Sequence, residues 1–324
     1  MTVLVTGGAG YIGAHVVRLL VEDGRDVVVV DDLSTGRADR VGGAELVQVD
    51  LAAPGAAEAV GDVVRRRGVT EVVHFAARKR VDESVAEPLR YYQENVDGLV
   101  AVLDACTRHD VRSVVFSSSA AVYGEVPGGL VREDAPTAPV NPYGRTKLVG
   151  EWLLRDVAAT GALRGTSLRY FNVAGAGWPE LGDQAVMNLV TLVLAAVERG
   201  ERPRVLGTDY PTPDGSGVRD YVHVLDVARA HVAALAAMRG AGEAYRCFNV
   251  GTGVGTSVLQ VVGGLAAAMG VPLEPELADR RAGDPAEVVA DTTSIREALG
   301  WVAQEPLEST LSSAWSAWRH AHLA

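Results

Sequence analysis

Short apolar runs alternate with longer amphipathic stretches along the first half of the chain. The apolar runs cover residues 2–6, 26–30, 46–49, 71–75, 113–116 and 167–171. Between the first two runs, apolar residues repeat at helical spacing from Ile12 to Leu20, and Gly24 follows where a helix C-terminal cap is expected. Short β-rich runs separated by helical patterns predict βαβ units, so we expect a parallel sheet covered by helices.

The pattern becomes looser after about residue 172. Stretches rich in Gly and Pro interrupt it at 174–183, 207–217 and 270–285. We therefore expect an α/β protein with a Rossmann-type doubly wound parallel sheet in residues 1–172 and a smaller C-terminal α/β lobe in residues 173–324. Some C-terminal elements are expected to pack back on the first part.

The composition of the chain limits the kinds of partner that it is expected to bind. The chain has 324 residues, 48% of them hydrophobic, and a formal net charge of −11. Because phosphate-rich surfaces attract concentrated Lys and Arg, this charge disfavours binding to nucleic acid or to an anionic membrane. Cys106 and Cys247 lie far apart among apolar neighbours, which fits buried thiols better than a disulfide or a metal site. No signal-peptide or membrane-spanning pattern occurs, so a cytoplasmic protein is expected.

The segment TGGAGYIG, residues 6–13, runs from the first predicted strand into the first predicted helix. Glycines at this turn allow the backbone to approach a pyrophosphate, and the helix N-terminus supplies N–H groups and a positive dipole. A tight turn alone would also explain them, but the context favours a dinucleotide. Asp31 follows the second strand at the spacing of a ribose-binding acid, and Asp31 and Asp32 would repel a 2′-phosphate, so NAD is favoured over NADP.

The segment NPYGRTK, residues 141–147, contains one of only two lysines in the chain. Asn141 can cap a helix, and Tyr143 and Lys147, four residues apart, then share one helix face. An ammonium near a phenol lowers the phenol pKa, which predicts a general base that works near neutral pH. A Ser hydroxyl from the segment SSSAAVYG, residues 117–124, would hydrogen-bond the same substrate oxygen. A chance surface pair is the alternative, but no other Tyr has Lys four residues on.

Several longer segments make the chain resemble the extended short-chain dehydrogenase/reductase family, and within it the nucleotide-sugar 4-epimerases. They include VLVTGGAGYIG, VVHFAARKRVDESVAEPLRYYQENVDG, VVFSSSAAVYG, NPYGRTKLVGE, LRYFNVAGA and DYPTPDGSGVRDYVHV. The resemblance covers essentially the whole chain, and GSGVRDYVHV is far more specific than the glycine motif.

The resemblance implies roles for the catalytic residues. Tyr143 would be the base, Ser119 its hydroxyl partner, and Lys147 the residue that binds the nicotinamide ribose and lowers the pKa of the tyrosine. Lys79, the other lysine of the chain, would lie beside the cofactor. Arg is a poor substitute at either position because it is broader and cannot present a compact ammonium.

The resemblance also implies the binding residues, and no metal is expected. Those expected to contact NAD are Gly7, Gly10, Tyr11, Ile12, Gly13, Asp31, Asp32, Asp50, Leu51, Phe75, Ala76, Ala77, Lys79, Asn95, Tyr143, Lys147 and Tyr170. The expected substrate is a nucleotide sugar, specifically a UDP-hexose. The residues expected to contact it are Ser119, Tyr143, Asn172, Asn188, Leu189, Val205, Leu206, Arg219, Arg281, Asp284 and Val288.

Two alanines favour one reaction within the family. Related dehydratases and decarboxylases carry carboxylates just before VYG, whereas this chain has Ala120 and Ala121, which cannot transfer a proton. The resemblance therefore implies an NAD-dependent epimerase that interconverts UDP-glucose and UDP-galactose through a transient 4-keto sugar. An epimerase or ketoreductase of a specialised nucleotide sugar is the alternative. A non-catalytic NAD-binding regulator is a remote one, because Ser119, Tyr143 and Lys147 are intact.

Three departures from the family pattern concern the sugar and the base. Leu206 stands where the family usually has an aromatic residue that packs on uracil. The loop at 176–187 is short, and the Pro expected after Leu189 is absent. At the position that gates the sugar pocket, Val288 replaces a bulky aromatic side chain, which predicts tolerance of N-acetylhexosamines. Family members are commonly homodimers through helices at about 88–109 and 143–158, so a homodimer is expected.

Overall fold

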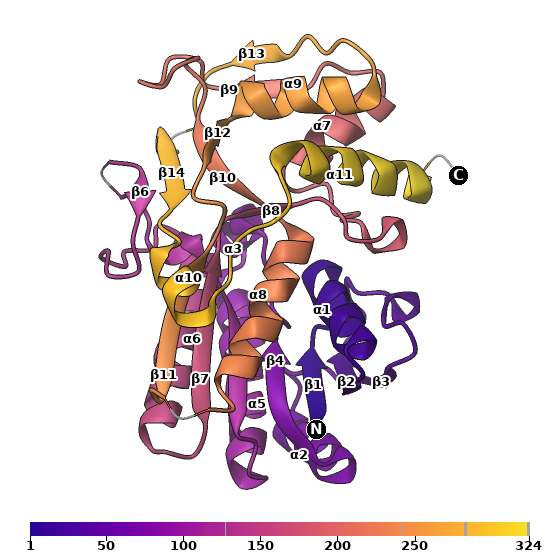
Figure 1. Ribbon diagram of the computed structural model, residues 1–324, viewed down its shortest axis with the longest axis vertical. Helices are drawn as coiled ribbons and strands as arrows, with labels where there is room; N and C mark the ends of the chain where they lie inside the picture. Colours follow the sequence, from indigo (N-terminus) through magenta and orange to yellow (C-terminus); the bar gives the residue numbers. More distant parts are fainter. Residues whose placement is uncertain (127, 241, 282–283, 323–324) are drawn as a thin grey trace.

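The computed structural model describes residues 1–126, 128–240, 242–281 and 284–322 (Figure 1). Its centre is a sheet of parallel strands in the order β11-β7-β5-β4-β1-β2-β3. The strands are β1 (Thr2–Thr6), β2 (Asp26–Asp31), β3 (Glu45–Gln48), β4 (Val69–His74), β5 (Ser113–Ser119), β7 (Arg164–Tyr170) and β11 (Tyr245–Val250). The six predicted runs are all strands of this sheet, which confirms the expected α/β fold. The seventh strand, β11, was not predicted.

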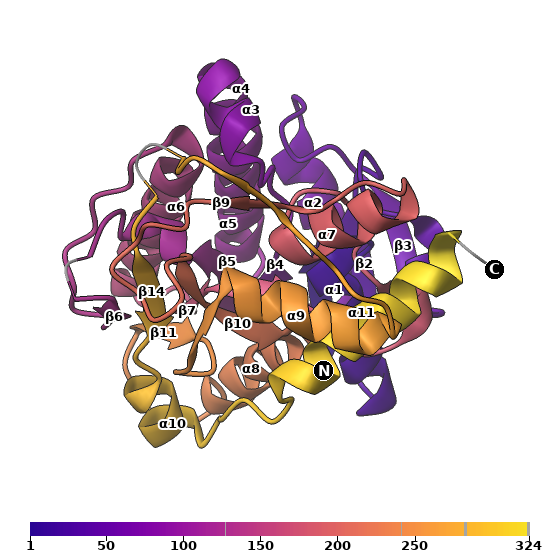
Figure 2. The ribbon, with the colours of Figure 1, turned by 90° about the horizontal axis from the view of Figure 1, so that it is seen from above.

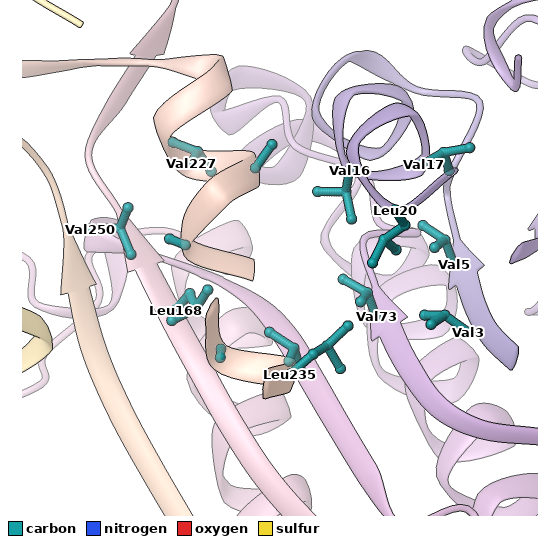
Figure 3. Close-up of a cluster of buried hydrophobic side chains, with 14 of the residues drawn as sticks. Val3, Val5, Val16, Val17, Leu20, Val73, Leu168, Val227, Leu235 and Val250 are labelled. Carbon is teal, nitrogen blue, oxygen red and sulfur yellow. The ribbon is translucent and has the colours of Figure 1, made fainter. Parts of the chain in front are cut away.

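Helices cover both faces of the sheet. On one face lie α1 (Tyr11–Glu22) and α8 (Val224–Ala237), and on the other lie α2 (Ala56–Arg67), α5 (Gly98–Arg108) and α6 (Pro142–Ala159). Figure 3 shows the first of these cores, where Leu20 of α1 and Leu235 of α8 meet Val3, Val5 and other strand residues. Successive strand residues point to opposite faces, so Leu4 belongs to the other core. Burial on both faces explains why the strands are continuous apolar runs.

The remaining elements form a second, smaller assembly. A five-stranded sheet is built from β12 (Gly255–Ser257), β10 (Val218–His223), β14 (Glu287–Ala290), β6 (Leu130–Val131) and β8 (Asn172–Ala174), and a two-stranded sheet from β9 (Arg204–Leu206) and β13 (Glu276–Ala278). The helices that pack with them are α7 (Leu189–Glu198), α9 (Val258–Met269) and α11 (Leu307–His322). In Figure 2, α9 and α11 lie side by side. β11 and α8, although late in the chain, belong to the large sheet and its cover.

Short helices connect these parts. They are η1 (Ala38–Arg40), α3 (Val81–Ala86), α4 (Pro88–Tyr92), the π-helix η2 (Gln93–Asp97), η3 (Ala120–Val122), η4 (Pro179–Leu181) and α10 (Thr293–Leu299). Within the described residues, no helix is both long and apolar enough to span a membrane.

The strand order indicates which edge of the large sheet is expected to bind ligands. From β1 the chain adds β2 and β3 on one side and β4, β5 and β7 on the other, so the order reverses between β1 and β4. Ligands of open α/β sheets bind beyond the carboxyl ends of the strands at such a reversal point. The carboxyl ends of these strands carry most of the residues that the sequence singled out.

Candidate active site

The turn between β1 and α1 leaves no room for side chains. Gly7 has φ of +69°, and a Cβ there would lie 2.6 Å from the backbone nitrogen of Ala76. A Cβ at Gly13 would lie 2.2 Å from the carbonyl oxygen of Gly7. Gly10 is the N-cap of α1 and offers no side-chain cap, so the first N–H groups of the helix stay available. This backbone cradle at the reversal point has free N–H groups of the kind that a pyrophosphate needs, and the contact of these glycines with NAD stays a prediction.

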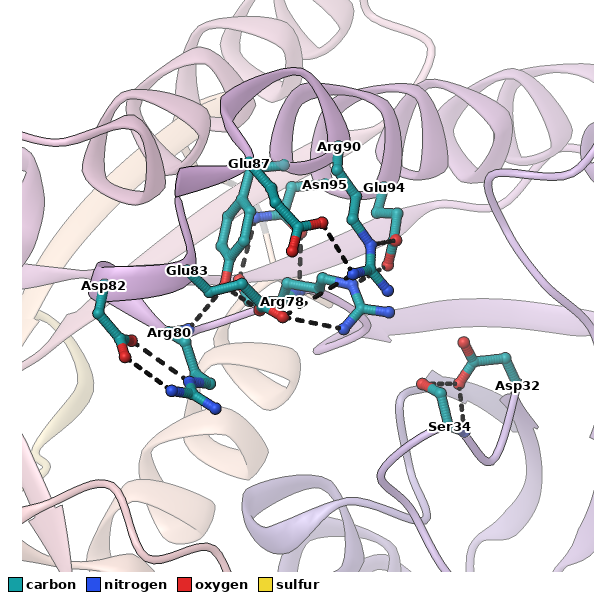
Figure 4. Close-up of polar contacts among 11 residues, drawn as sticks. Asp32, Ser34, Arg78, Arg80, Asp82, Glu83, Glu87, Arg90, Glu94 and Asn95 are labelled. Carbon is teal, nitrogen blue, oxygen red and sulfur yellow. Dashed lines mark hydrogen bonds and ion pairs between the residues drawn. The ribbon is translucent and has the colours of Figure 1, made fainter. Parts of the chain in front are cut away.

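The acidic residues expected at the ribose lie at the end of β2. The Asp31 carboxylate is buried and accepts hydrogen bonds from the N–H groups of Ala9 (3.0 Å) and Leu33 (2.9 Å). Burial raises the pKa of Asp31, and these two bonds act against that rise. Asp32 is exposed and accepts from the Ser34 N–H and hydroxyl, at 2.9 and 2.7 Å (Figure 4). Both carboxylates keep free lone pairs that suit ribose hydroxyl groups.

A cleft of about 520 Å³ opens beside these acids. It is lined by Asp32, Asp50, Ala52, Arg78, Arg90, Gln93, Glu94 and Asp97. Of these, only Asp32 and Asp50 were predicted site residues. Arg78 and Arg90 both bind the Glu94 carboxylate, the latter at 2.7 Å (Figure 4). Because each guanidinium already has a carboxylate partner, this cleft is poorly suited to a 2′-phosphate, in agreement with the expected preference for NAD.

The other residues expected at NAD lie around this turn. Tyr11 is buried and donates its hydroxyl to the Gly175 carbonyl at 2.6 Å, and Ile12 packs on the core under α1. Leu51 is buried in the core that α2 and α5 cover. Phe75, Ala76 and Ala77 follow β4 directly and are half-buried.

Asn95 and Lys79 are held by protein groups. The Asn95 amide accepts from the Arg78 N–H at 2.7 Å and donates to the Thr146 hydroxyl at 3.0 Å, so it ties the segment after β4 to α6. The Lys79 ammonium lies 4.0 Å from the Asp183 carboxylate. Asp183 was not predicted as a site residue, because its contact with Lys79 depends on how the loop before α7 folds. The roles of Asn95 and Lys79 toward NAD stay predictions.

The helix that carries Tyr143 and Lys147 begins as predicted. Asn141 accepts a hydrogen bond from the Gly144 N–H at 2.8 Å, and Pro142 is the first residue of α6. The Lys147 side chain is almost completely buried, and its ammonium donates to the Ser117 carbonyl at 2.8 Å. The nitrogen lies 5.9 Å from the centre of the Tyr143 ring. Burial lowers the pKa of Lys147 to about 7.

The prediction for the pKa of Tyr143 was wrong in its direction for the chain alone. Burial raises the pKa of the phenol, and the hydrogen bond with Ser119 lowers it by less. The spacing of Tyr143 and Lys147 could not reveal the burial that dominates. The contact with Ser119 agrees with the prediction that β5 supplies a hydroxyl partner. Tyr170 donates its hydroxyl to Ser117, so it braces the same strand end.

Residues expected at the nucleotide sugar are distributed over the smaller assembly. Asn172 is exposed at the start of β8, and Leu189 is the first residue of α7. Asn188 caps α7 by accepting from the Thr191 N–H at 3.0 Å, and it donates to Asp183 at 3.0 Å. Its side chain therefore already has structural partners. The side chain of Val205 is fully buried, so only its backbone is available to a ligand.

The remaining substrate candidates lie on β9, β10 and the segment that leads into β14. Leu206 and Arg219 are half-buried, and Arg219 donates to the Val218 carbonyl at 2.8 Å. Val288 pairs with Arg219 across β14 and β10 and packs beside the cluster that contains Phe171. Two further candidates precede β14, the exposed Arg281 and the half-buried Asp284.

Comparison with known proteins places these features in a family. A family model described as the NAD dependent epimerase/dehydratase family matches residues 3–251. A UDP-glucose 4-epimerase of Azospirillum brasilense is 46% identical over 320 residues, which cover 97% of this chain and 91% of the relative. A UDP-glucose 4-epimerase of Corynebacterium glutamicum is 43% identical over 321 residues, which cover 98% of this chain and 95% of the relative.

A solved structure shares the whole fold. The crystal structure of UDP-glucose-4-epimerase from Stenotrophomonas maltophila, with bound NAD and formylated UDP-arabinopyranose, is 40% identical and superimposes with a TM-score of 0.94 over 100% of both chains. The chain therefore belongs to the NAD dependent epimerase/dehydratase family.

Proposed function

We propose that this protein interconverts UDP-glucose and UDP-galactose with NAD as its cofactor. The observation that carries the proposal is the meeting of Ser119, Tyr143 and Lys147 at the carboxyl edge of the large sheet, the edge that also carries the glycine turn. Relatives at 43–46% identity over nearly the full chain are UDP-glucose 4-epimerases, which supports this reaction over the alternatives.

The chain's own groups account for the proton transfer. Tyr143 removes the proton of the sugar 4-hydroxyl, and Ser119 hydrogen-bonds the same oxygen. The Lys147 ammonium, in reach of the ribose side of the site, favours the phenolate by its charge. When bound, NAD accepts a hydride from C4 of the sugar and returns it. Reversal of configuration then needs the 4-keto sugar to present its other face, and no second acid or base is required beside Ala120 and Ala121.

The substrate side of the proposal rests on two arginines and on the smaller assembly. Arg219 and Arg281 supply guanidinium groups that suit the two phosphates of a nucleotide diphosphate sugar. We assign NAD binding to residues 1–172 and nucleotide-sugar binding mainly to residues 173–324. β11 and α8 are exceptions, because they belong to the large sheet and its cover.

A homodimer is also proposed. Leu89 of α4 is 78% exposed and Trp152 of α6 is 51% exposed, and Val100 of α5 is exposed as well. Large apolar side chains gathered on neighbouring surface helices are typical of protein interfaces. The cytoplasmic location expected from the sequence stays a prediction.

The test is direct. The purified protein is incubated with UDP-galactose, and the sugar nucleotides are separated by chromatography, with UDP-glucose as the expected product. Tyr143→Phe is the matched variant, because it removes only the hydroxyl. It is expected to retain NAD and to lose most of the turnover, by about 100-fold or more. Full activity in this variant would refute the role of Tyr143, and no product from the wild type would refute the reaction.

A further inference from the structure

A buried ion pair lies behind the candidate active site, between α6 and β7. The Glu151 side chain is 0% exposed and that of Arg169 is 4% exposed. Two parallel hydrogen bonds join them, from Nη2 to Oε2 at 2.6 Å and from Nε to Oε1 at 2.8 Å. Bidentate contacts of this kind fix the relative orientation as well as the distance of the two groups.

This pair reaches the chain on both sides of Ser119. The Ser118 hydroxyl donates to Glu151 Oε1 at 2.5 Å. Arg169 Nη1 donates to the Tyr123 hydroxyl at 2.9 Å, and that hydroxyl donates to Asn249 Oδ1 at 2.6 Å. Both the residue before Ser119 and the turn after it are therefore tied to the ion pair.

The other end of the pair belongs to the helix of the proposed base. Glu151 follows Lys147 by four residues and Tyr143 by eight, so the three side chains lie along one helix face. Ser118 and Ser119 point to opposite faces of β5, and their strand partners in β7 are Arg169 and Tyr170. The ion pair thus connects the residues on either side of Ser119 to the face of α6 that carries Tyr143.

Stability alone explains this arrangement poorly. A buried ion pair usually contributes little more than well-packed apolar residues of the same size, because desolvation cancels much of the attraction. Fixing one geometry is the better-attested use of such a pair. The contact between Ser119 and the phenol of Tyr143 requires a strand end and a helix to keep their register, and displacements of about 1 Å lower turnover by about 100-fold.

We propose that Glu151 and Arg169, with Ser118 and Tyr123, are positioning residues that hold Ser119 in register with Tyr143 and Lys147. This inference rests on the proposed epimerase function. None of the four side chains is required to touch the sugar or the cofactor. They act through the placement of the strand end, the turn after it and α6.

The test compares Glu151→Gln and Ser118→Ala with Glu71→Gln. Glu71 is a matched control, because its side chain is 4% exposed and pairs with Arg25 and Arg239. It faces Ser113 in the register of β4 and β5, five residues before Ser118, which places it about 17 Å from the site. All three variants are purified with their NAD, and kcat and KM are measured with UDP-galactose from pH 6 to pH 10 (roughly the range in which a lysine with a lowered pKa titrates).

We expect Glu151→Gln to lower kcat by about 10- to 100-fold while KM and the bound NAD stay close to those of the wild type. The loss in kcat should be similar across this pH range, because burial is the cause that shifts the pKa of Lys147 and the ion pair is not among its causes. Adding Arg169→Gln to Glu151→Gln should leave kcat low, because neither change restores the contact with Ser118. Ser118→Ala should lower kcat in a protein that folds normally, and Glu71→Gln should change neither kcat nor its pH profile.

Wild-type kcat in both Glu151→Gln and Ser118→Ala, or an equal loss in Glu71→Gln, would overturn the inference. If the wild type itself does not convert UDP-galactose, the proposed function fails and the positioning role is read from amide hydrogen exchange instead. Exchange at residues 119–123 and 143–147 should then be faster in Glu151→Gln than in Glu71→Gln. Equal rates in these two variants would reject the positioning role on their own.

Discussion

The ammonium of Lys147 donates a hydrogen bond to the carbonyl of Ser117, 2.8 Å away, and the lysine is almost completely buried. The same nitrogen lies 5.1 Å from the centre of the Phe116 ring. A chain that uses Arg at almost every other basic position therefore has a geometric reason to use Lys here. A compact ammonium on a flexible stem fits between a strand carbonyl and an aromatic ring, and a planar guanidinium does not.

Two replacements of Lys147 test the charge and the shape of its side chain separately. Lys147→Arg keeps the charge but is too broad for the pocket, and Lys147→Met keeps the length without the charge. We expect both variants to lose about 100-fold or more in kcat. Steady-state assays with UDP-galactose measure the loss. Near-normal turnover in Lys147→Arg would show that charge alone is sufficient and that the compact shape has no role.

Much of this site follows from local sequence, and the reasons are physical. The N-cap at Asn141 and the individual apolar strands are set by residues close together in the chain, so spacing and periodicity predict them. β11 joins the sheet only because Cys247 and its neighbours pair with β7, 80 residues earlier in the chain. The direction of the Tyr143 pKa was missed for a similar reason, because burial is a property of the packed protein.

Buried histidines make stability sensitive to acid. Burial lowers the pKa of His74 to about 3, and the His74 ring bonds the Thr6 hydroxyl at 2.8 Å. Burial also lowers the pKa of His15 and of His231 to about 4. In the unfolded chain these groups titrate near their ordinary value of about 6.5. Between that value and the folded pKa the unfolded state binds more protons, so stability is complete above pH 6.5 and falls as the pH is lowered.

Chemical denaturation from pH 7.5 to 5 measures this effect. The free energy of unfolding should fall below about pH 6.5, at up to about 1.4 kcal/mol per pH unit for each such histidine. His74→Asn removes one titrating group, so the slope should decrease by up to that amount while the overall stability at neutral pH also changes. An unchanged slope in this variant would mean that His74 is not held neutral by the fold.

The glycine turn gives a prediction for cofactor retention. In Gly13→Ala the new Cβ meets the Gly7 carbonyl oxygen at 2.2 Å, so the turn must open and the backbone cradle is lost. We expect a purified protein with much less bound NAD, measured from the absorbance of the nucleotide released on denaturation. Gly263→Ala in α9 is the control, because a Cβ there meets nothing within 4 Å. It should keep NAD and gain about 0.5–1 kcal/mol of stability.

Val288 gives a prediction for the sugar. It pairs with Arg219 in the smaller assembly and packs beside the cluster that contains Phe171, and its side chain is small. If Val288 borders the C2 side of the sugar, as the family resemblance implies, the wild type has room for an N-acetyl group. Val288→Tyr would fill that room with an aromatic ring. We expect this variant to keep its turnover of UDP-galactose and to lose about 10-fold or more on UDP-GlcNAc, because steric exclusion acts on the larger substrate alone.

The measurement is the ratio of kcat/KM for the two sugar nucleotides in wild type and variant. Val288→Leu is the control, since it adds one carbon without a ring and should change the ratio by less than the tyrosine does. Loss of both activities in Val288→Tyr would indicate that the β10–β14 pairing was disturbed, and circular dichroism and bound NAD would check this. Failure of wild type and Val288→Tyr alike on UDP-GlcNAc, with UDP-galactose turned over normally by both, would remove Val288 as the residue that sets sugar size.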